Sequence, residues 1–163
     1  MIRLTGCLLV MCGGFMGMFL QVRERRRRAE ALRSVTEALR RATEEIRMRR
    51  TPLPRLMERL SASVGGEVGR CFAEMSAGIQ KGDSPEVVWQ MEVERLPLLT
   101  EDKNSLRELE WQGDEEKICN GILLAIQRLT RSEEVQRQSA PQETKRSAAL
   151  WVSGAALLMI LLI

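Results

Sequence analysis

The 163-residue chain contains no histidine and no tyrosine, and aromatic residues make up only 4% of it. Without histidine it lacks the usual general base near neutral pH and the commonest metal ligand. It also lacks a glycine-rich phosphate loop and a carboxylate placed beside a plausible nucleophile. We therefore predict a protein that is not an enzyme, with no catalytic residue, no metal site and no cofactor.

The four cysteines, Cys7, Cys12, Cys71 and Cys119, do not form a zinc or redox motif, because no two of them stand at the two-residue spacing. We interpret them as small apolar side chains. With so few aromatic residues, a core has to be filled by leucine, valine, isoleucine, methionine and alanine. That set of residues favours helices.

Two uncharged runs lie at the ends of the sequence. The first, residues 4–22, would be roughly 28 Å long as a helix, which matches the hydrocarbon core of a bilayer. The second, residues 147–163, is at the short limit for a span. We predict a transmembrane helix for each. A secretory signal is the alternative for the first run, but only three residues precede the lipoprotein-like box that ends at Cys7.

Basic residues predict the orientation of both spans. Arg3 alone precedes the first run, whereas five arginines follow within a few residues, and Lys145 with Arg146 precedes the second run. The positive-inside rule then puts residues 23–140 in the cytoplasm and both termini outside. Arginines in the run Arg25, Arg26, Arg27 and Arg28 are candidates for contact with anionic headgroups, although they could serve only to set the topology.

The segment between the runs has helical periodicity almost throughout, and no stretch of it alternates like a strand. An apolar seam on a long first helix is formed by Leu32, Val35, Leu39, Ala42 and Ile46. A second helix is expected with Thr51 as its cap and Pro52 as its first residue, and a third is expected after Gly66. A fourth helix is expected after a cap at Asp83 or Ser84, and a fifth from about Thr100 to Trp111. The sixth is expected to begin at Asp114 and to continue until Pro141 restarts the chain. The predicted fold is all-α, a cytoplasmic bundle of about six helices flanked by an N-terminal and a C-terminal transmembrane helix.

Charge is unevenly distributed along this segment. Arg23–Arg55 holds 12 basic and five acidic residues, whereas Glu67–Glu116 holds five basic and 13 acidic residues. The overall balance is too even for a nucleic-acid binder. The acidic part could be a solvated face or could pair with the first helix. We predict instead a membrane-distal acidic surface that docks a cytosolic partner, with Glu92, Glu94, Glu101 and Asp102 as candidate contacts.

Each terminal run contains a pair of small residues four positions apart. Gly13 with Gly17, and Ala149 with Ser153, would let helix backbones approach closely in the membrane, although such pairs are also common by chance. Packing of this kind could join the two spans or other subunits, and it is compatible with a homo-oligomer. Trp89 is in step with Val93 and Leu96 and is expected in the core, whereas Trp111 could be core or a partner anchor.

The order of these features resembles the stage III sporulation protein AB family of endospore-forming bacteria over nearly the whole chain. The similarity is carried by Glu45 with Ile46, Thr51 to Pro54 with Leu56 and Leu60, Phe72, Ser84 with Pro85 and Trp89, Glu101 with Asp102, and Ile160 to Ile163. The resemblance implies a non-enzymatic platform subunit of the secretion-like channel complex that links mother cell and forespore and is needed for sporulation.

Further properties follow from the same resemblance. It implies a cytosolic domain similar to the platform protein of type II secretion. It also implies that the protein lies in the cell membrane on the mother-cell side, which is the outer forespore membrane. The implied partners are other subunits of the complex, including its secretion-type ATPase. The alternative is a membrane-anchored regulatory protein that binds a nucleotide or an anionic lipid through its basic first helix, with Arg47, Arg49 and Arg50 as its cluster. A membrane enzyme is a third possibility, which the missing histidine disfavours.

Overall fold

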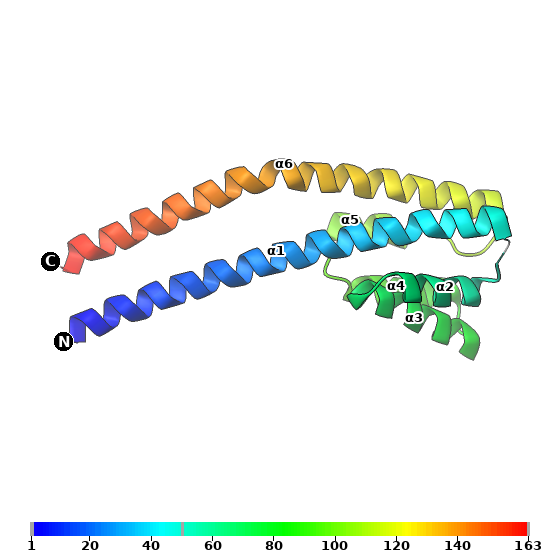
Figure 1. The fold of residues 1–163 in the computed structure, drawn as a ribbon, viewed down its shortest axis with the longest axis horizontal. Coiled ribbons are helices and arrows are strands. Elements are labelled where there is room, and N and C mark those ends of the chain that lie inside the picture. The colour runs from blue at the N-terminus through cyan, green and yellow to red at the C-terminus, as the bar shows by residue number, and fades with distance from the viewer. Residues whose placement is uncertain (1, 50, 163) are drawn as a thin grey trace. The chain divides into compact units, whose positions relative to one another are not determined.

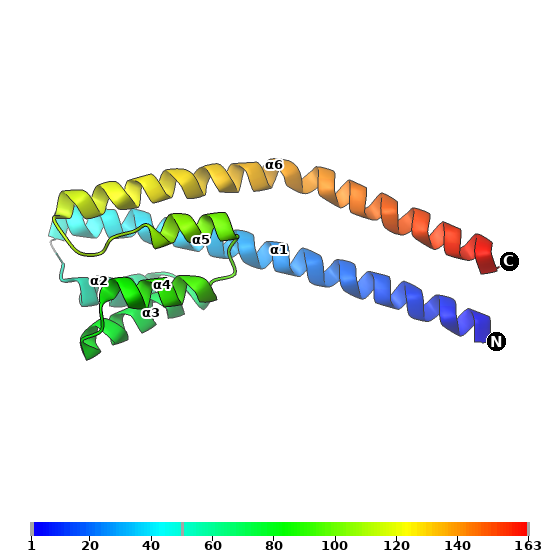
Figure 2. The same ribbon diagram turned by 180° about the vertical axis from the view of Figure 1, so that it is seen from behind.

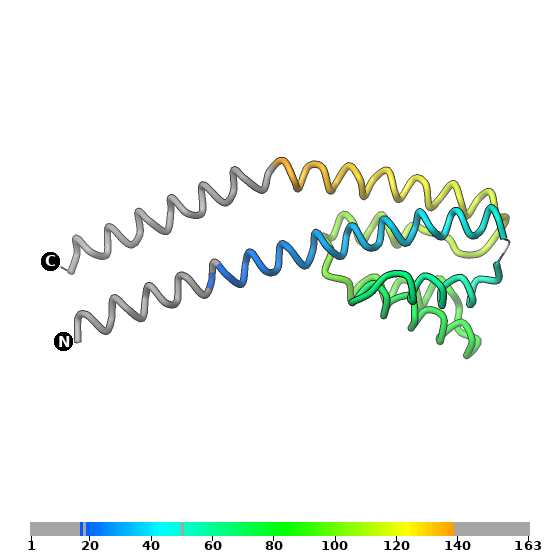
Figure 3. Tube along the Cα trace, in the orientation of Figure 1, coloured from blue at the N-terminus to red at the C-terminus, as the bar shows by residue number. Residues whose placement is uncertain are grey.

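A computed structural model describes the backbone of residues 2–49 and 51–162 and the side chains of residues 17, 19–49 and 51–138 (Figure 3). Six helices account for most of these residues, and none of the described residues lies in a strand (Figure 1). The helices are α1 (Ile2–Arg49), α2 (Leu53–Ser63), α3 (Gly66–Lys81), α4 (Pro85–Arg95), α5 (Thr100–Arg107) and α6 (Glu115–Leu162). The predicted all-α class and helix number are confirmed for this part of the chain.

The chain divides into two compact units. One is Arg27–Glu133, which we call the bundle, and the other combines Met1–Arg26 with Glu134–Ile163. The bundle contains α2 to α5 together with the adjoining parts of α1 and α6. It is a few residues shorter at each end than the predicted cytoplasmic domain, residues 23–140.

Among the residues with described side chains, no helix is both long enough and apolar enough to cross a membrane. The predicted spans, residues 4–22 and 147–163, lie outside those residues except for Gly17 and residues 19–22. In that small part, Phe19, Leu20 and Val22 are exposed. The two spans therefore stay predictions.

One hydrophobic core holds the bundle together, and all six helices contribute to it. The predicted seam of α1 is confirmed, because each of its five residues is at most 6% exposed: Leu32, Val35, Leu39, Ala42 and Ile46. Trp89 of α4 is fully buried, and its ring centroid lies 5.8 Å from that of Phe72 and 5.1 Å from that of Trp111. Trp111 is only 3% exposed, so it belongs to the core and is not a partner anchor.

The helices of the bundle follow one another as antiparallel neighbours. In Figure 1, α2, α3 and α4 lie on one side of α1, and α6 runs back along α1 in the opposite direction. Seen from behind, α5 lies in front of α1 (Figure 2). An ion pair of 2.8 Å between Arg33 and Glu133 joins the outgoing and returning helices within the bundle. The first and last residues of the bundle, Arg27 and Glu133, therefore lie toward the same end of it.

Helix ends differ from the prediction in their details. Pro52 is the N-cap of α2 and makes no side-chain cap, so the helix begins one residue later than predicted. The hydroxyl of Thr51 instead donates to Glu45 over 3.4 Å. Ser84 is the N-cap of α4, but its hydroxyl donates to the carboxylate of Glu86 over 2.8 Å, so no capping box forms with Asp83.

Two predicted boundaries near the end of the chain are wrong. α5 ends at Arg107 instead of Trp111, because Leu109 and Trp111 reach the core from the irregular segment 108–114. α6 continues through Pro141, where a restart was predicted. A proline removes one backbone hydrogen bond of a helix and can kink it without ending it.

Candidate functional site: an interaction surface

The described interior of the bundle contains neither a metal-ligand cluster nor an ionised Cys71 thiol. The described side chains include no cluster of three or more histidine, cysteine or acidic residues suited to a metal ion. Cys71 is buried, and this burial raises the pKa of its thiol to about 12, with a further contribution from the negative charge of Glu92. The thiol is therefore protonated near neutral pH, and it is not the thiolate that nucleophilic chemistry needs.

A charged groove lies where α1 enters the bundle, and we call it the entry groove. It has a volume of about 330 Å³ and is lined by α1, α3 and α4. Six charged side chains line it, three of each sign: Arg27, Glu67, Arg70, Glu74, Glu92 and Arg95. Its formal charge is therefore zero.

Two ion pairs neutralise four of these six side chains. Arg27 donates through Nε to Oε1 of Glu67 over 3.0 Å, and Arg95 donates to Oε1 of Glu92 over 2.6 Å. The second carboxylate oxygen of Glu67 is buried, yet it receives no hydrogen bond from any residue that the structure describes. Arg70 and Glu74 form no hydrogen bond or ion pair with other described residues. The charged side chains that line the groove are therefore only partly paired with one another.

The four predicted docking residues do not form one exposed acidic patch. Glu92 and Asp102 are only 7% and 3% exposed, because α4 and α5 turn them toward the interior of the bundle. Glu94 is exposed but forms ion pairs with Lys103, at 3.5 Å, and with Arg107. Glu101 is exposed at the start of α5. Of the four predicted docking residues, only Glu94 and Glu101 are therefore exposed.

Within the bundle, the predicted docking residues lie toward the end at which Arg27 lies, and their distance from a membrane stays a prediction. Glu92 lines the same groove as Arg27, the residue with which the bundle begins. α4 runs back toward that end of the bundle (Figure 1), so its last turn and the start of α5 lie there. The direction of α4 could have been inferred from the sequence by counting the short antiparallel helices from Arg27 onward.

Other acidic residues occupy the opposite end of the bundle, which we call the far acidic end. They come from the α3–α4 turn and from the segment before α6: Asp83, Glu86, Glu110, Asp114 and Glu116. The two segments are joined by Gln112, whose amide donates to the carboxylate of Glu86 over 3.0 Å. These residues are far apart in the sequence, and only the directions of α3, α4 and α5 bring them to one surface.

The outward face of α4 connects these two ends, and we call it the α4 face. Val87 and Met91, one turn apart, are 56% and 54% exposed. The charged residues Glu86 and Glu94 lie one residue before and three residues after this apolar pair, and Gln90 is exposed beside it. An apolar centre with a polar rim is the usual anatomy of a protein interface. The α4 face is therefore the best candidate for partner docking.

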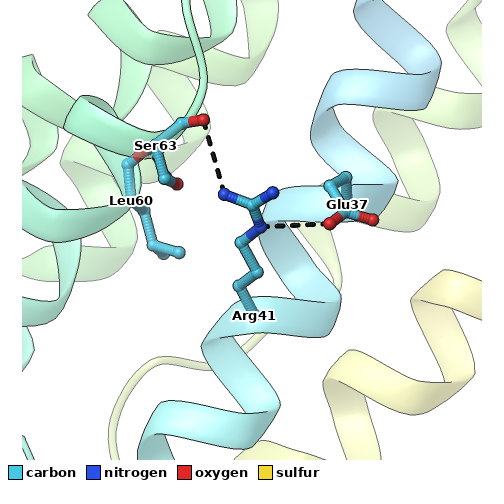
Figure 4. Close-up of polar contacts among 4 residues, drawn as sticks. All are labelled: Glu37, Arg41, Leu60 and Ser63. Atoms are coloured by element: carbon cyan, nitrogen blue, oxygen red, sulfur yellow. Dashed lines mark hydrogen bonds and ion pairs between the residues drawn. The ribbon is translucent and has the colours of Figure 1, made fainter.

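The basic first helix is largely neutralised where it meets α2. Figure 4 shows Arg41 between the two helices, with Nε donating to Glu37 over 3.0 Å and Nη1 reaching the carbonyl oxygen of Ser63 at 3.5 Å. Close by, Glu45 forms ion pairs with Arg49, at 3.4 Å, and with Arg59, at 2.9 Å. In the predicted nucleotide cluster, Arg49 is thus paired, Arg47 is exposed and Arg50 lies outside the described residues.

The predicted membrane contacts are not brought together into a defined site. Of the four arginines, Arg26 and Arg27 are exposed, Arg25 and Arg28 are half-buried, and Arg27 is bound to Glu67 as described. Among the small residues, a Cβ atom added at Gly17 would meet no atom within 4 Å. The other three, Gly13, Ala149 and Ser153, lie outside the residues with described side chains. Their roles stay predictions.

The geometry defines a class of protein, a small helical bundle whose charged and apolar outer surfaces are its candidate sites for binding. A solved structure of a protein called "Stage III sporulation protein AB (SpoIIIAB)" is similar to it, with a TM-score of 0.64 and 22% sequence identity over 71% of this chain and 98% of that one. A comparison with curated proteins gives no match. The family model for stage III sporulation protein AB matches residues 3–163. The chain belongs to the stage III sporulation protein AB family, as the resemblance predicted, and this membership indicates a role in sporulation.

Proposed function

We propose that this chain is a non-enzymatic platform subunit in the membrane-embedded, secretion-like channel complex that links mother cell and forespore. The single observation that carries this proposal is the family match over residues 3–163, because it includes both apolar runs as well as the bundle. The bundle supplies a stable scaffold with one core.

The proposed arrangement follows from charge. Both runs are flanked on the bundle side by basic residues, Arg23 with Arg25 to Arg28 and Lys145 with Arg146. The positive-inside rule then holds the bundle against the cytoplasmic face, with both termini outside. A subunit held in this way can contact membrane subunits through its spans and cytosolic subunits through its bundle.

The α4 face is the proposed docking surface for the secretion-type ATPase of the complex. Burying Val87 and Met91 against an apolar partner surface would supply the favourable energy, since each is more than half exposed in this chain. The acidic side chains beside them would favour a partner surface that carries lysine or arginine, and would steer its approach. The basic first helix is a weaker candidate for ligand binding, because glutamates already pair with Arg41 and Arg49.

Co-purification of the full-length protein with the ATPase from sporulating cells tests the docking. The variant Val87→Asp with Met91→Asp places charge at the centre of the α4 face, so we expect at least a tenfold loss of ATPase capture. The matched control is Leu123→Asp with Leu124→Asp on α6, where the side chains are 39% and 48% exposed. Capture that is unchanged in the α4 variant, or reduced equally in the control, would show that the ATPase does not dock here.

A further inference from the structure

The entry groove presents a line of alternating charges on one side of α3. Glu67, Arg70 and Glu74 are spaced by three and four residues, so they lie on one face of the helix. Arg27 of α1 and Arg95 of α4 complete the lining. A volume of about 330 Å³ is at the small end of the range for ligand sites, roughly 300–1,000 Å³.

After the two ion pairs are counted, the groove has one cation and one carboxylate to offer. The cation is Arg70 and the carboxylate is that of Glu74; both side chains are exposed, and neither has a partner among the described residues. The second oxygen of Glu67 also lacks a donor, but it is buried and therefore not open to a ligand.

This mixture of charges disfavours simple ions. A free phosphate would meet three glutamates, and a metal cation would meet three arginines in the same groove. A ligand that carries both charges a few bonds apart would meet each sign where it is needed. The ligand should also have N–H donors, because the carboxylate of Glu74 can only accept a hydrogen bond.

We propose that the entry groove binds the zwitterionic headgroup of an ethanolamine phospholipid. The phosphate accepts hydrogen bonds from the guanidinium of Arg70, which suits the planar fork of arginine. The ammonium group donates to the carboxylate of Glu74. A choline headgroup has no N–H on its quaternary nitrogen, so it cannot supply the second contact, and the groove should discriminate between the two lipids.

A lipid is the favoured source of this headgroup because of where the groove lies in the sequence. Arg27 is the fifth residue after Val22, with which the first apolar run ends. Access to lipid rests on the proposed function, since the groove faces headgroups only if that run is a transmembrane span. The preference for phosphoethanolamine itself rests on the groove alone.

The full-length protein in detergent tests the headgroup chemistry by calorimetric titration with three soluble probes. We expect glycerophosphoethanolamine to bind, and glycerophosphocholine and glycerol phosphate to bind at least tenfold more weakly. The variants Arg70→Ala and Glu74→Ala should each weaken the binding of the first probe at least tenfold. Both side chains are exposed, so the fold should be retained.

The matched control is Arg40→Ala and Glu44→Ala on α1. This pair has the same types and spacing as Arg70 and Glu74, and it is also exposed and without a described partner, but it lies outside the groove. The control variants should bind glycerophosphoethanolamine as the unmodified protein does. Absence of binding, equal binding of all three probes, or an equal loss in the control variants would overturn the proposal.

A second measurement identifies the source of the headgroup. In phosphatidylcholine vesicles, a photoactivatable phosphatidylethanolamine should crosslink to the reconstituted protein, and the signal should fall in Arg70→Ala. Binding of the soluble probe without this crosslink would overturn the lipid as source. ATPase capture is measured separately on the unmodified protein. Absence of capture while the headgroup still binds would count against the proposed docking alone. Absence of headgroup binding while the ATPase is still captured would count against the headgroup site alone.

Discussion

The indole Nε1 of Trp89 donates a hydrogen bond of 2.7 Å to the carbonyl oxygen of Leu106. The bond joins the middle of α4 to the last turn of α5. Both residues are fully buried, and the same indole ring packs against Phe72 and Trp111. Trp89 therefore links α3, α4 and α5 with the segment that leads into α6.

Removing the indole should destabilise the bundle in two steps. Trp89→Phe keeps an apolar ring but removes one of the two hydrogen bonds that the carbonyl of Leu106 accepts, the other coming from the backbone N–H of Leu109, so it should cost about 0.5–1.5 kcal/mol. Trp89→Ala also creates a cavity and should cost about 3–5 kcal/mol. Urea denaturation followed by circular dichroism measures both changes. The exposed neighbour Gln90→Ala should change the unfolding free energy by no more than about 0.5 kcal/mol. A Trp89→Phe protein as stable as the original would contradict this role of the hydrogen bond.

Gly69 allows α2 and α3 to approach closely, and a methyl group there should be destabilising. A Cβ atom at Gly69 would lie 2.1 Å from the carbonyl oxygen of Val64, which is backbone and cannot move aside cheaply. We expect Gly69→Ala to lower the unfolding free energy by at least about 2 kcal/mol, at the level of an overpacked core.

Gly121 of α6 is the matched control for this substitution. Its nearest contact with an added Cβ would be ordinary, 3.9 Å from a side-chain carbon of Leu109. Alanine has the higher helix propensity, so Gly121→Ala should raise the stability by up to about 1 kcal/mol. Thermal unfolding of both variants gives the comparison, and a Gly69→Ala protein that gains stability as the control does would show that the close approach is unimportant.

Apolar periodicity was sufficient to predict most of the fold. The steps of three and four residues that place Leu32, Val35 and Leu39 on one face do so in any α-helix, and the structure buries all three. Gly82 ends α3 with a φ of 95°, which glycine adopts without strain, and a glycine at the end of an apolar helical pattern is a local signal of this kind. These features are local, so the sequence determines them without knowledge of the tertiary structure.

The candidate surfaces could not be predicted from the sequence in the same way. Glu92 and Glu94 are two residues apart, yet the first is buried beside Arg95 and the second is exposed, because burial depends on how α4 is rotated against α3. Counting charges along the sequence gave these two residues the same role. The α4 face was missed because Val87 and Met91 resemble core residues until the packing partner of each face is known.

The buried thiol of Cys71 should make stability depend on alkaline pH. Its pKa is about 12 in the folded chain against the ordinary 9.0, so the thiol ionises more easily once the protein unfolds. The contribution of Cys71 is therefore complete below pH 9 and is lost progressively as the pH rises from 9 toward 12. By about pH 10 the loss should be about 1 kcal/mol.

Comparison with Cys71→Ala isolates this effect from other ionisations. The difference in unfolding free energy between the two proteins should be constant from about pH 7 to 8.5, below the ordinary thiol pKa, and should shrink above it. Denaturation at a series of pH values under reducing conditions provides the data. A difference that stays constant to about pH 10.5 would mean that the Cys71 thiol is not protected by burial.

The central claim is that the bundle lies on the cytoplasmic side of a membrane to which both terminal runs hold it. Gln127 of α6 is exposed, whereas Cys71 and Cys119 are buried, so Gln127→Cys in a chain without Cys7 and Cys12 gives one accessible thiol on the bundle. A membrane-impermeant maleimide is applied to sporulating cells before and after the membrane is opened. The account predicts labelling at residue 127 only after opening; full labelling in intact cells would contradict it.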